Sequence, residues 1–158
     1  MSWQCRGDCW FSSEGLKMSF ENLTTTWTPR GLSVLRIMSA LLFMEHGTLK
    51  ILGFPASDRP AMELLSLGGI AGFFELFGGA LLFLGLFTRP VAFLLSGVMA
   101  FAYFIAHAPR SFFPVLNGGD AAILYCFVFL YFAFAGGGAW SIDVFRAKSS
   151  DVADRKVS

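Results

Sequence analysis

Long apolar stretches separated by short polar segments occupy most of this chain. Each stretch is close to the roughly 20 residues that an α-helix needs to cross the hydrocarbon core of a bilayer. There are four of them, over Leu32–Leu52, Gly68–Phe87, Val91–Ala108 and Ala121–Ala139. The pattern therefore predicts an all-α, multi-pass integral membrane protein built as a bundle of four transmembrane helices.

The polar segments at the two ends divide the chain into three parts. Residues 1–30 form a polar N-terminal segment, residues 31–143 the four-helix membrane domain, and residues 144–158 a polar tail that we expect to be disordered. Residues 1–17 lack the apolar core of a signal peptide, and Met18 follows them directly. We therefore expect Met18 to be the natural start and residues 1–17 to be a non-native extension.

The distribution of basic residues predicts the orientation of the bundle. If the N-terminus is cytoplasmic, eight of the twelve Lys and Arg residues lie on the cytoplasmic side: Arg6, Lys17, Arg30, Arg89, Arg146, Lys148, Arg155 and Lys156. Three lie on the opposite side, namely Lys50, Arg59 and Arg110. This excess obeys the positive-inside rule. With four spans, both termini are then cytoplasmic.

Composition narrows the classes of function. Hydrophobic residues make up 55% of the 158 residues and charged residues 15%, so we expect no second, soluble domain. The net charge of +1 gives no basic surface for nucleic acid. Cys5 and Cys9 have no second pair of ligands nearby, and Cys126 lies inside the fourth stretch. The sequence contains no nucleophile elbow, phosphate-binding loop or haem-attachment motif.

Charged side chains inside the first two apolar stretches are the strongest functional signal. Arg36, His46 and Lys50 share one helical face of the first stretch, and Glu75 lies near the middle of the second. A charge inside the bilayer costs about 2.5–3.5 kcal/mol or more, so such groups usually face the bundle interior and find a partner. We expect Glu75 to pair with Arg36 or His46. Glu45 falls on the opposite side of its helix, as expected of a charge at headgroup level.

Two further residues, His107 and Asp120, complete the candidate polar core. Counted at about 1.5 Å per residue, they lie at the outer end of the bundle together with His46 and Lys50. If these faces converge, the core opens outward and Glu75 forms its floor. Two histidines without a close third ligand argue against a metal ion, so we predict no metal site.

Glycines predict where the first two helices touch. Gly68, Gly72 and Gly79 share the face of the second stretch that carries Glu75, and Gly47 lies on the polar face of the first. Small residues allow helix backbones to approach closely in membranes. Glu75 is therefore expected on a packed face and not in contact with lipid.

Three interpretations of the polar core remain open. A buried ion pair can serve only to hold helices in register. The same side chains can line a pocket for a ligand or a redox cofactor, or they can form a path for protons or ions.

Motifs distributed over most of the chain carry a family resemblance. The first stretch reads RIMSALLFMEHGTLK up to Lys50, the second contains FFELFGG around Glu75 and leads into GLFTRP, and NGGD precedes the fourth. In combination, over residues 32–143, these motifs resemble the DoxX family, in the branch of YphA-like inner-membrane proteins. The resemblance implies a compact four-helix membrane fold. It also implies six motif positions in this chain: Arg36, His46, Lys50, Glu75, His107 and Asp120. Asp120 stands where Glu is common in the family, and Glu45 where an uncharged residue is expected.

The resemblance also implies a role near membrane redox chemistry. Relatives are linked to thiosulfate:quinone oxidoreductase, and a mycobacterial relative to a membrane complex with superoxide dismutase and a sulfurtransferase. The implied function is an accessory or quinone-associated subunit of a membrane redox or oxidative-stress system, with a protein partner or a homo-oligomer in the bilayer. Two alternatives stay open: a non-enzymatic scaffold or carrier of a small lipophilic molecule, and a small transporter or proton path. Catalytic activity is left open.

Overall fold

The computed structural model describes residues 13–56 and 62–157, and the side chains of residues 24–56 and 62–150. In this described part every regular element is helical. The elements are α1 (Ser13–Leu52), α2 (Leu67–Phe73), η1 (Phe74–Gly78), α3 (Gly79–Leu84), α4 (Thr88–Ala102), η2 (Tyr103–His107), α5 (Pro114–Asn117), α6 (Asp120–Ala135) and α7 (Ile142–Val157). The expected all-α class is confirmed for these residues.

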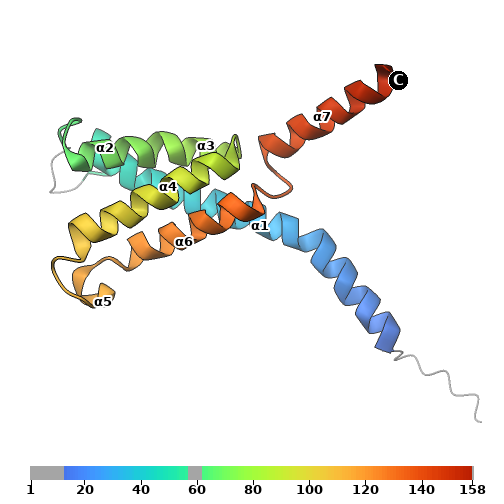
Figure 1. The fold of residues 1–158 in the computed structure, drawn as a ribbon, viewed down its shortest axis with the longest axis horizontal. Helices are drawn as coiled ribbons and strands as arrows, with labels where there is room; N and C mark the ends of the chain where they lie inside the picture. Colours follow the sequence, from blue (N-terminus) through green and yellow to red (C-terminus); the bar gives the residue numbers. More distant parts are fainter. Residues whose placement is uncertain (1–12, 57–61, 158) are drawn as a thin grey trace, which may run out of the picture.

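The first helix, α1, is longer than the apolar stretch that predicts it. It has 40 residues and passes through Pro29, whereas the apolar pattern begins at Leu32. The Pro29 carbonyl oxygen accepts hydrogen bonds from the Ser33 hydroxyl and the Ala139 N–H, so this part of α1 is tied to the segment after α6. The first half of α1 extends away from the bundle (Figure 1).

The second apolar stretch forms one continuous helical run of three elements, α2, η1 and α3. It begins at Ser66, whose hydroxyl accepts a hydrogen bond from the Gly69 N–H, as an N-cap residue does. It ends at Gly85, which has a positive φ of 67° that favours glycine. The middle element, η1, is a π-helical segment, in which each turn holds more residues than an α-helical turn.

The third stretch, α4 followed by η2, also ends in a π-helical segment. The turn that precedes it runs through Gly85 to Phe87, and Thr88 is already helical. The third stretch was expected to begin at Val91, three residues later than the helix does. The helix opens earlier because the N–H groups of Phe87 and Thr88 are bonded to the Asp143 carboxylate.

Three helical runs in the described part are long and apolar enough to cross a membrane: Thr24–Leu52, Leu67–Leu84 and Thr88–His107. The fourth, α6, is apolar but has 16 residues, or about 24 Å against a hydrocarbon core of about 30 Å. It was expected to continue to Ala139. It ends earlier because Gly136 adopts a φ of 85°, outside the helical region.

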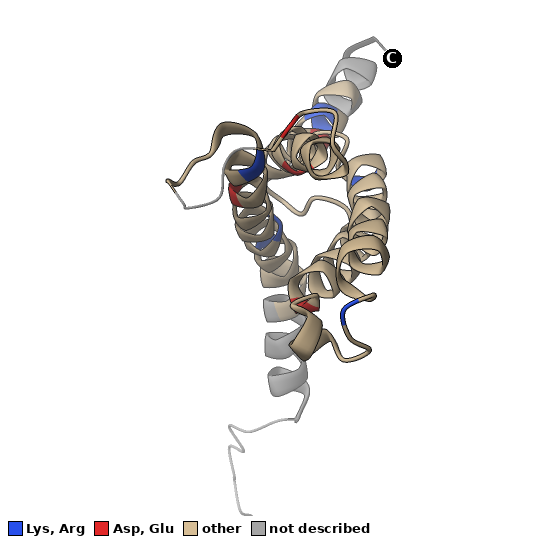
Figure 2. Ribbon diagram, turned by 90° about the vertical axis from the view of Figure 1, so that its left-hand side faces the viewer, with Lys and Arg blue, Asp and Glu red and all other residues tan. Residues whose placement is uncertain are grey.

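The helices pack as two neighbouring pairs, with α1 along the α2–α3 run and α4 along α6 (Figure 1). A buried aromatic pair joins them, since the rings of Phe43 and Phe129 meet edge to face at 4.8 Å. The core consists of Ala40, Phe43, Leu82, Ala92, Leu95, Met99, Phe129 and Phe132. Large apolar side chains also cover the outside, and few charged residues interrupt the helices (Figure 2). Such a surface suits contact with lipid.

Two expectations concern the ends of the chain. Where a disordered tail is expected, the structure has α7, which points away from the bundle (Figure 1). Its sequence contains neither Gly nor Pro, so nothing in it interrupts a helix. The structure does not describe residues 1–12. The first twelve residues of the expected extension over residues 1–17, and the Cys5–Cys9 pair with them, therefore lie outside the described residues.

Candidate functional site

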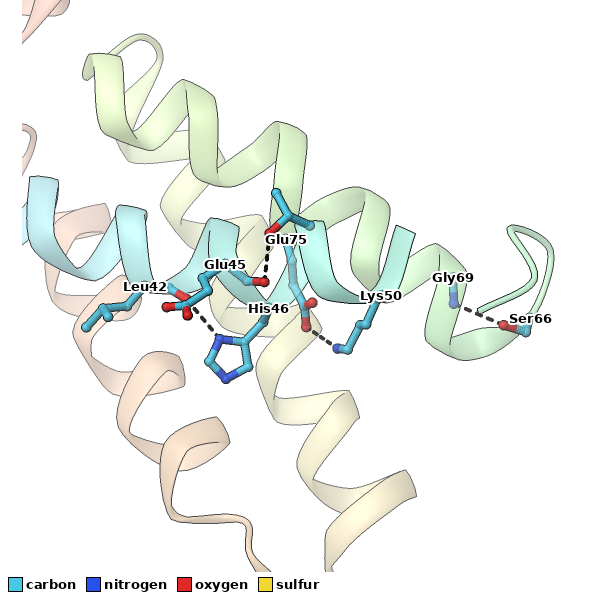
Figure 3. A network of polar contacts seen from close by, with 8 residues as sticks. Leu42, Glu45, His46, Lys50, Ser66, Gly69 and Glu75 are labelled. Atoms are coloured by element: carbon cyan, nitrogen blue, oxygen red, sulfur yellow. Dashed lines mark hydrogen bonds and ion pairs between the residues drawn. The ribbon is translucent and has the colours of Figure 1, made fainter. Parts of the chain in front are cut away.

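The polar end of α1 meets the second helical run at an ion pair. Lys50, in the last turn of α1, reaches Glu75 in η1, and the Lys50 Nζ and Glu75 Oε1 atoms lie 2.5 Å apart (Figure 3). The expectation that Glu75 pairs with Arg36 or His46 is wrong. The reason is the close approach of α1, which carries the stem of Lys50 past Gly72 to the level of Glu75.

Two glycines create this close approach. A Cβ atom at Gly47 would lie 2.6 Å from the backbone nitrogen of Leu76, and one at Gly72 would lie 2.9 Å from the Cβ of Lys50. Neither position has room for a larger residue without moving a helix. The helices can therefore hold Glu75 against Lys50 only because these residues lack side chains.

The other two glycines of the predicted packing face have different neighbours. A Cβ atom at Gly79 would lie 2.6 Å from the Cγ of Met44 in α1, so Gly79 belongs to the same contact. Gly68 lies against the sulfur of Met62 in the connection between α1 and α2. The contact between the two helices thus involves Gly47, Gly72 and Gly79.

Only one oxygen of the Glu75 carboxylate has a partner. Oε1 binds Lys50, whereas Oε2 is buried and has no hydrogen-bond partner among the described residues. The Glu75 side chain is 3% exposed. A buried acceptor without a donor costs about 1–3 kcal/mol. Such a group is a recognised feature of binding sites, and Glu75 also lies in a π-helical segment, which occurs frequently at functional sites.

Two histidines flank this carboxylate from different helices. His46 of α1 places Nδ1 2.8 Å from the carbonyl oxygen of Leu42 (Figure 3). His107, in the second π-helical segment η2, places Nδ1 3.1 Å from the carbonyl oxygen of Asn117. In both rings the other nitrogen, Nε2, has no hydrogen bond within the described part of the chain.

These side chains share one cavity of about 160 Å³. Its lining comes from α1, η1, α4, η2, α6 and the residue at the end of α5. The residues are Phe43, His46, Lys50, Glu75, Met99, Ala102, His107, Gly118, Ala121, Ala122 and Tyr125. The structure thus brings together four of the six predicted polar residues, with Glu75 at the buried end and His46 at the exposed one. We call this the Lys50–Glu75 cavity.

Tyr125 and Asn117 also belong to this region, although no pattern in the sequence marks them as candidate site residues. The ring of Tyr125 meets the ring of His46 edge to face at 6.0 Å. Asn117 is buried and holds the segment before α6 by accepting from the Gly119 N–H and donating to the Ser111 carbonyl. Neither residue is adjacent to His46 or His107 in the sequence, so only the folded structure places them beside the histidines.

Arg36 lies elsewhere, at the opposite end of the core. It is completely buried, and its guanidinium donates to four backbone carbonyl oxygens, those of Leu82, Phe83, Gly137 and Trp140. Two of these carbonyls end α3, where the helix dipole favours a cation. Arg36 therefore joins α1 to the end of α3 and to the glycine-rich segment after α6.

The structure separates Asp120 from the cavity and assigns a role to another acid. Asp120 is exposed in the first turn of α6, where a negative charge suits the helix dipole. Asp143 binds the N–H groups of Phe87 and Thr88 at 2.9 and 2.8 Å, and so caps the start of α4 from α7. Asp143 lies just after the glycine-rich segment, outside the helical spacing that marks the other polar residues, so the sequence pattern does not single it out.

The surroundings of Asp143 alter its acidity. Burial acts to raise the pKa of this carboxyl group, but hydrogen bonds from Thr88 and Phe87 and the charge of Arg146 outweigh that effect. The pKa of Asp143 is therefore lowered from its ordinary value. Asp143 stays charged at neutral pH and contributes a charged cap to α4.

The described residues contain no candidate set of metal ligands. No three His, Cys, Asp or Glu side chains lie close enough together there to hold a metal ion. The cavity does combine acids, bases and an apolar wall, which can bind a small polar molecule and exchange protons with it.

Comparisons with known proteins connect this chain to a family and to a relative. The profile of the DoxX family matches residues 31–108, from α1 to the end of η2, and includes His46, Lys50, Glu75 and His107 of the cavity. An uncharacterized protein of Haemophilus influenzae is 45% identical over 122 residues, which cover 74% of this chain and 91% of that protein. No solved structure matches the chain. With its apolar helices and this extent of similarity, the chain belongs to the DoxX family of membrane proteins.

Proposed function

We propose that this DoxX-family protein is an accessory, quinone-associated subunit of a membrane redox or oxidative-stress system, of the YphA-like branch. The observation that carries the proposal is the Lys50–Glu75 cavity. Its volume of about 160 Å³ is close to the roughly 150 Å³ of an engineered cavity that holds benzene. The space therefore suits a single six-membered ring, such as the headgroup of a benzoquinone.

The side chains around this space fit the chemistry of such a ring. A bound quinone would supply a two-electron, two-proton couple. Lys50 can donate a hydrogen bond to a ring oxygen, and the ring nitrogens of His46 and His107 can form hydrogen bonds with a hydroxyl group. The unpaired Oε2 of Glu75 can accept a proton or a hydrogen bond. The apolar wall of Phe43, Met99 and the alanines would face the carbon skeleton.

The proposal includes a topology and a partner. We place four spans in the inner membrane with both termini in the cytoplasm, because Arg89, Arg146 and Lys148 lie at the Arg36 end. The short helix α6 would then end where the chain turns at Gly136. The described residues carry no group that transfers electrons, so the electrons would come from a protein partner, for which the subunit provides the quinone site.

Mass spectrometry of organic extracts tests the proposal. The wild type, Glu75→Gln and Asp120→Asn would be purified gently from native membranes. Asp120→Asn is the control, because Asp120 lies at the same end of the bundle as Glu75 but outside the cavity. We expect near-stoichiometric quinone in the wild type and in Asp120→Asn, and a large loss in Glu75→Gln. Bulk lipid alone in all three samples would reject the quinone role and favour the scaffold or carrier of another lipophilic molecule.

A further inference from the structure

The chemistry of the Lys50–Glu75 cavity restricts which ligand it accepts. The buried Glu75 carboxylate already binds the Lys50 ammonium through Oε1, so its second oxygen is available only as an acceptor. No described side chain or backbone N–H reaches that second oxygen. A ligand that brings a hydrogen-bond donor would satisfy it, whereas one that brings only acceptors would place lone pairs against it.

The two histidines add acceptors of the same kind. A carbonyl oxygen can only accept, so Nδ1 of His46, facing Leu42, and Nδ1 of His107, facing Asn117, each carry the ring proton. In the neutral ring the remaining nitrogen, Nε2, is then an acceptor. Within the described part of the chain, three acceptor atoms around the cavity thus have no hydrogen-bond partner, one from Glu75 and one from each histidine.

Donors in the same lining come from two side chains. They are the remaining N–H groups of Lys50 and the hydroxyl of Tyr125, while Phe43, Met99 and the alanines are apolar. A matching ligand is a ring with a hydroxyl group that donates toward Glu75 and a second oxygen that accepts from Lys50. Its carbon skeleton would lie against Phe43 and Met99.

We infer that the cavity selects a hydroxylated ring, and thus the reduced, quinol form of a quinone over the oxidised form. The naming of the ligand as a quinol rests on the proposed function, whereas the requirement for a donor rests on Glu75 and the histidines. An unpaired buried acceptor costs about 1–3 kcal/mol. The reduced form should therefore bind roughly ten- to a hundredfold more tightly than the oxidised form.

Equilibrium dialysis with the full chain in lipid nanodiscs tests this inference. One pair of probes is a ubiquinone with a single isoprene unit and its quinol, kept anaerobic. The second pair is phenol and toluene, which have nearly the same shape and differ in the donor. We expect the wild type and the control Asp120→Asn to prefer the quinol and phenol. In Glu75→Gln, the amide can present an N–H group, so the preference should shrink or reverse.

The outcomes separate the two proposals. Binding of the quinone as tightly as the quinol, or of toluene as tightly as phenol, by the wild type would overturn the selection of a donor while leaving a quinone site intact. Preference for phenol without binding of either ubiquinone form would support the donor requirement and reject the quinone function. Absence of binding by all four probes would overturn both. The wild-type comparison decides the matter even if Glu75→Gln does not fold.

Discussion

Both ends of the helical core bury a charged side chain, but they satisfy it to different degrees. At one end, Arg36 donates to four backbone carbonyl oxygens and leaves none of its nitrogens unpartnered. At the other end, Glu75 has one oxygen bound to Lys50 and one buried oxygen without a partner. A fully bonded buried charge stabilises one arrangement of helices, whereas a half-bonded one leaves an acceptor that a ligand with a hydrogen-bond donor can satisfy.

The two ends also differ in the regularity of the backbone. Arg36 lies in an uninterrupted α-helix and bonds to a helix end and a glycine-rich segment. Glu75 and His107 both lie in π-helical segments that face the same cavity. Irregular helical turns are therefore concentrated at the end with the unsatisfied acceptor. Substitutions at the Arg36 end should affect stability first, and substitutions at the Lys50–Glu75 cavity should affect binding as well.

The largest effect is expected from Arg36→Met. The substitution removes the donor of four carbonyl oxygens, two in buried hydrogen bonds and two in partly buried ones. Hydrogen bonds to charged groups contribute about 1.5–3 kcal/mol each. The free energy of unfolding, measured by titration from mild detergent into dodecyl sulfate, should fall by more than about 3 kcal/mol. Arg36→Lys should recover only part of it, because an ammonium lacks the planar fork of donors. An Arg36→Met protein as stable as the wild type would show that these bonds do not hold the bundle together.

A smaller loss is expected from Lys50→Met, which leaves both oxygens of the buried Glu75 carboxylate without a partner. The free energy of unfolding should fall by about 1–3 kcal/mol. Adding Glu75→Gln removes the unpaired charge, so the double variant should be more stable than the sum of the single effects predicts. Strict additivity in this double-mutant cycle would mean that the ion pair contributes nothing.

Gly47→Ala tests whether close packing holds the Lys50 end together. The new Cβ would meet the backbone of η1 at 2.6 Å, and such overpacking costs about 1–3 kcal/mol. Binding of the phenol probe should weaken as well, because Lys50 and Glu75 move apart. Gly97→Ala is the matched control, since a Cβ atom at Gly97 in α4 would lie more than 4 Å from the neighbouring atoms of the described residues. That variant should be as stable as the wild type or more so, by about 0.5–1 kcal/mol. Equal effects of the two substitutions would contradict the packing argument.

The smallest effect is expected at Asp143 and depends on pH. Because its pKa is lowered in the folded state, its contribution is complete above the pKa of the unfolded chain and disappears as the pH falls through the folded pKa. Asp143→Asn should lose about 0.3–1 kcal/mol at neutral pH. The melting temperatures of the two proteins should converge on acidification toward about pH 3. A constant difference across this range would show that the charge of Asp143 plays no part.

Much of the helical architecture follows from the sequence, for clear physical reasons. Apolar stretches of about 20 residues predict helices that are long enough to cross a bilayer. The second and third stretches agree with the observed helical runs to within three residues at each end, whereas the first agrees with α1 only at its C-terminal end, Leu52. The contact of α1 with Gly72 and Gly79 follows from helical spacing, because glycines on one face leave room for a neighbouring backbone. The convergence of His46, Lys50, Glu75 and His107 follows from similar depth along antiparallel helices.

Other features depend on contacts that a helical pattern does not encode. The sequence suggests a carboxylate as the partner of Arg36, but backbone carbonyls at a helix end serve equally well and lie in segments far apart in the chain. The π-helical turns depend on tertiary packing, since FELFG and YFIAH have no distinctive composition. Asp120 has the right depth for the cavity, yet it lies on the exposed face of α6.

The two π-helical segments have a consequence for how this protein tolerates insertions and deletions. A π-helical turn contains one residue more than an α-helical turn needs. Deleting one residue within η1 or η2 would let each run close into a regular helix, with better backbone hydrogen bonds and little strain elsewhere. We expect such a shortened protein to assemble as a bundle in which Glu75 and His107 are rotated away from one another. The extra residue of each π-helical turn would then serve the cavity and not the assembly of the helices.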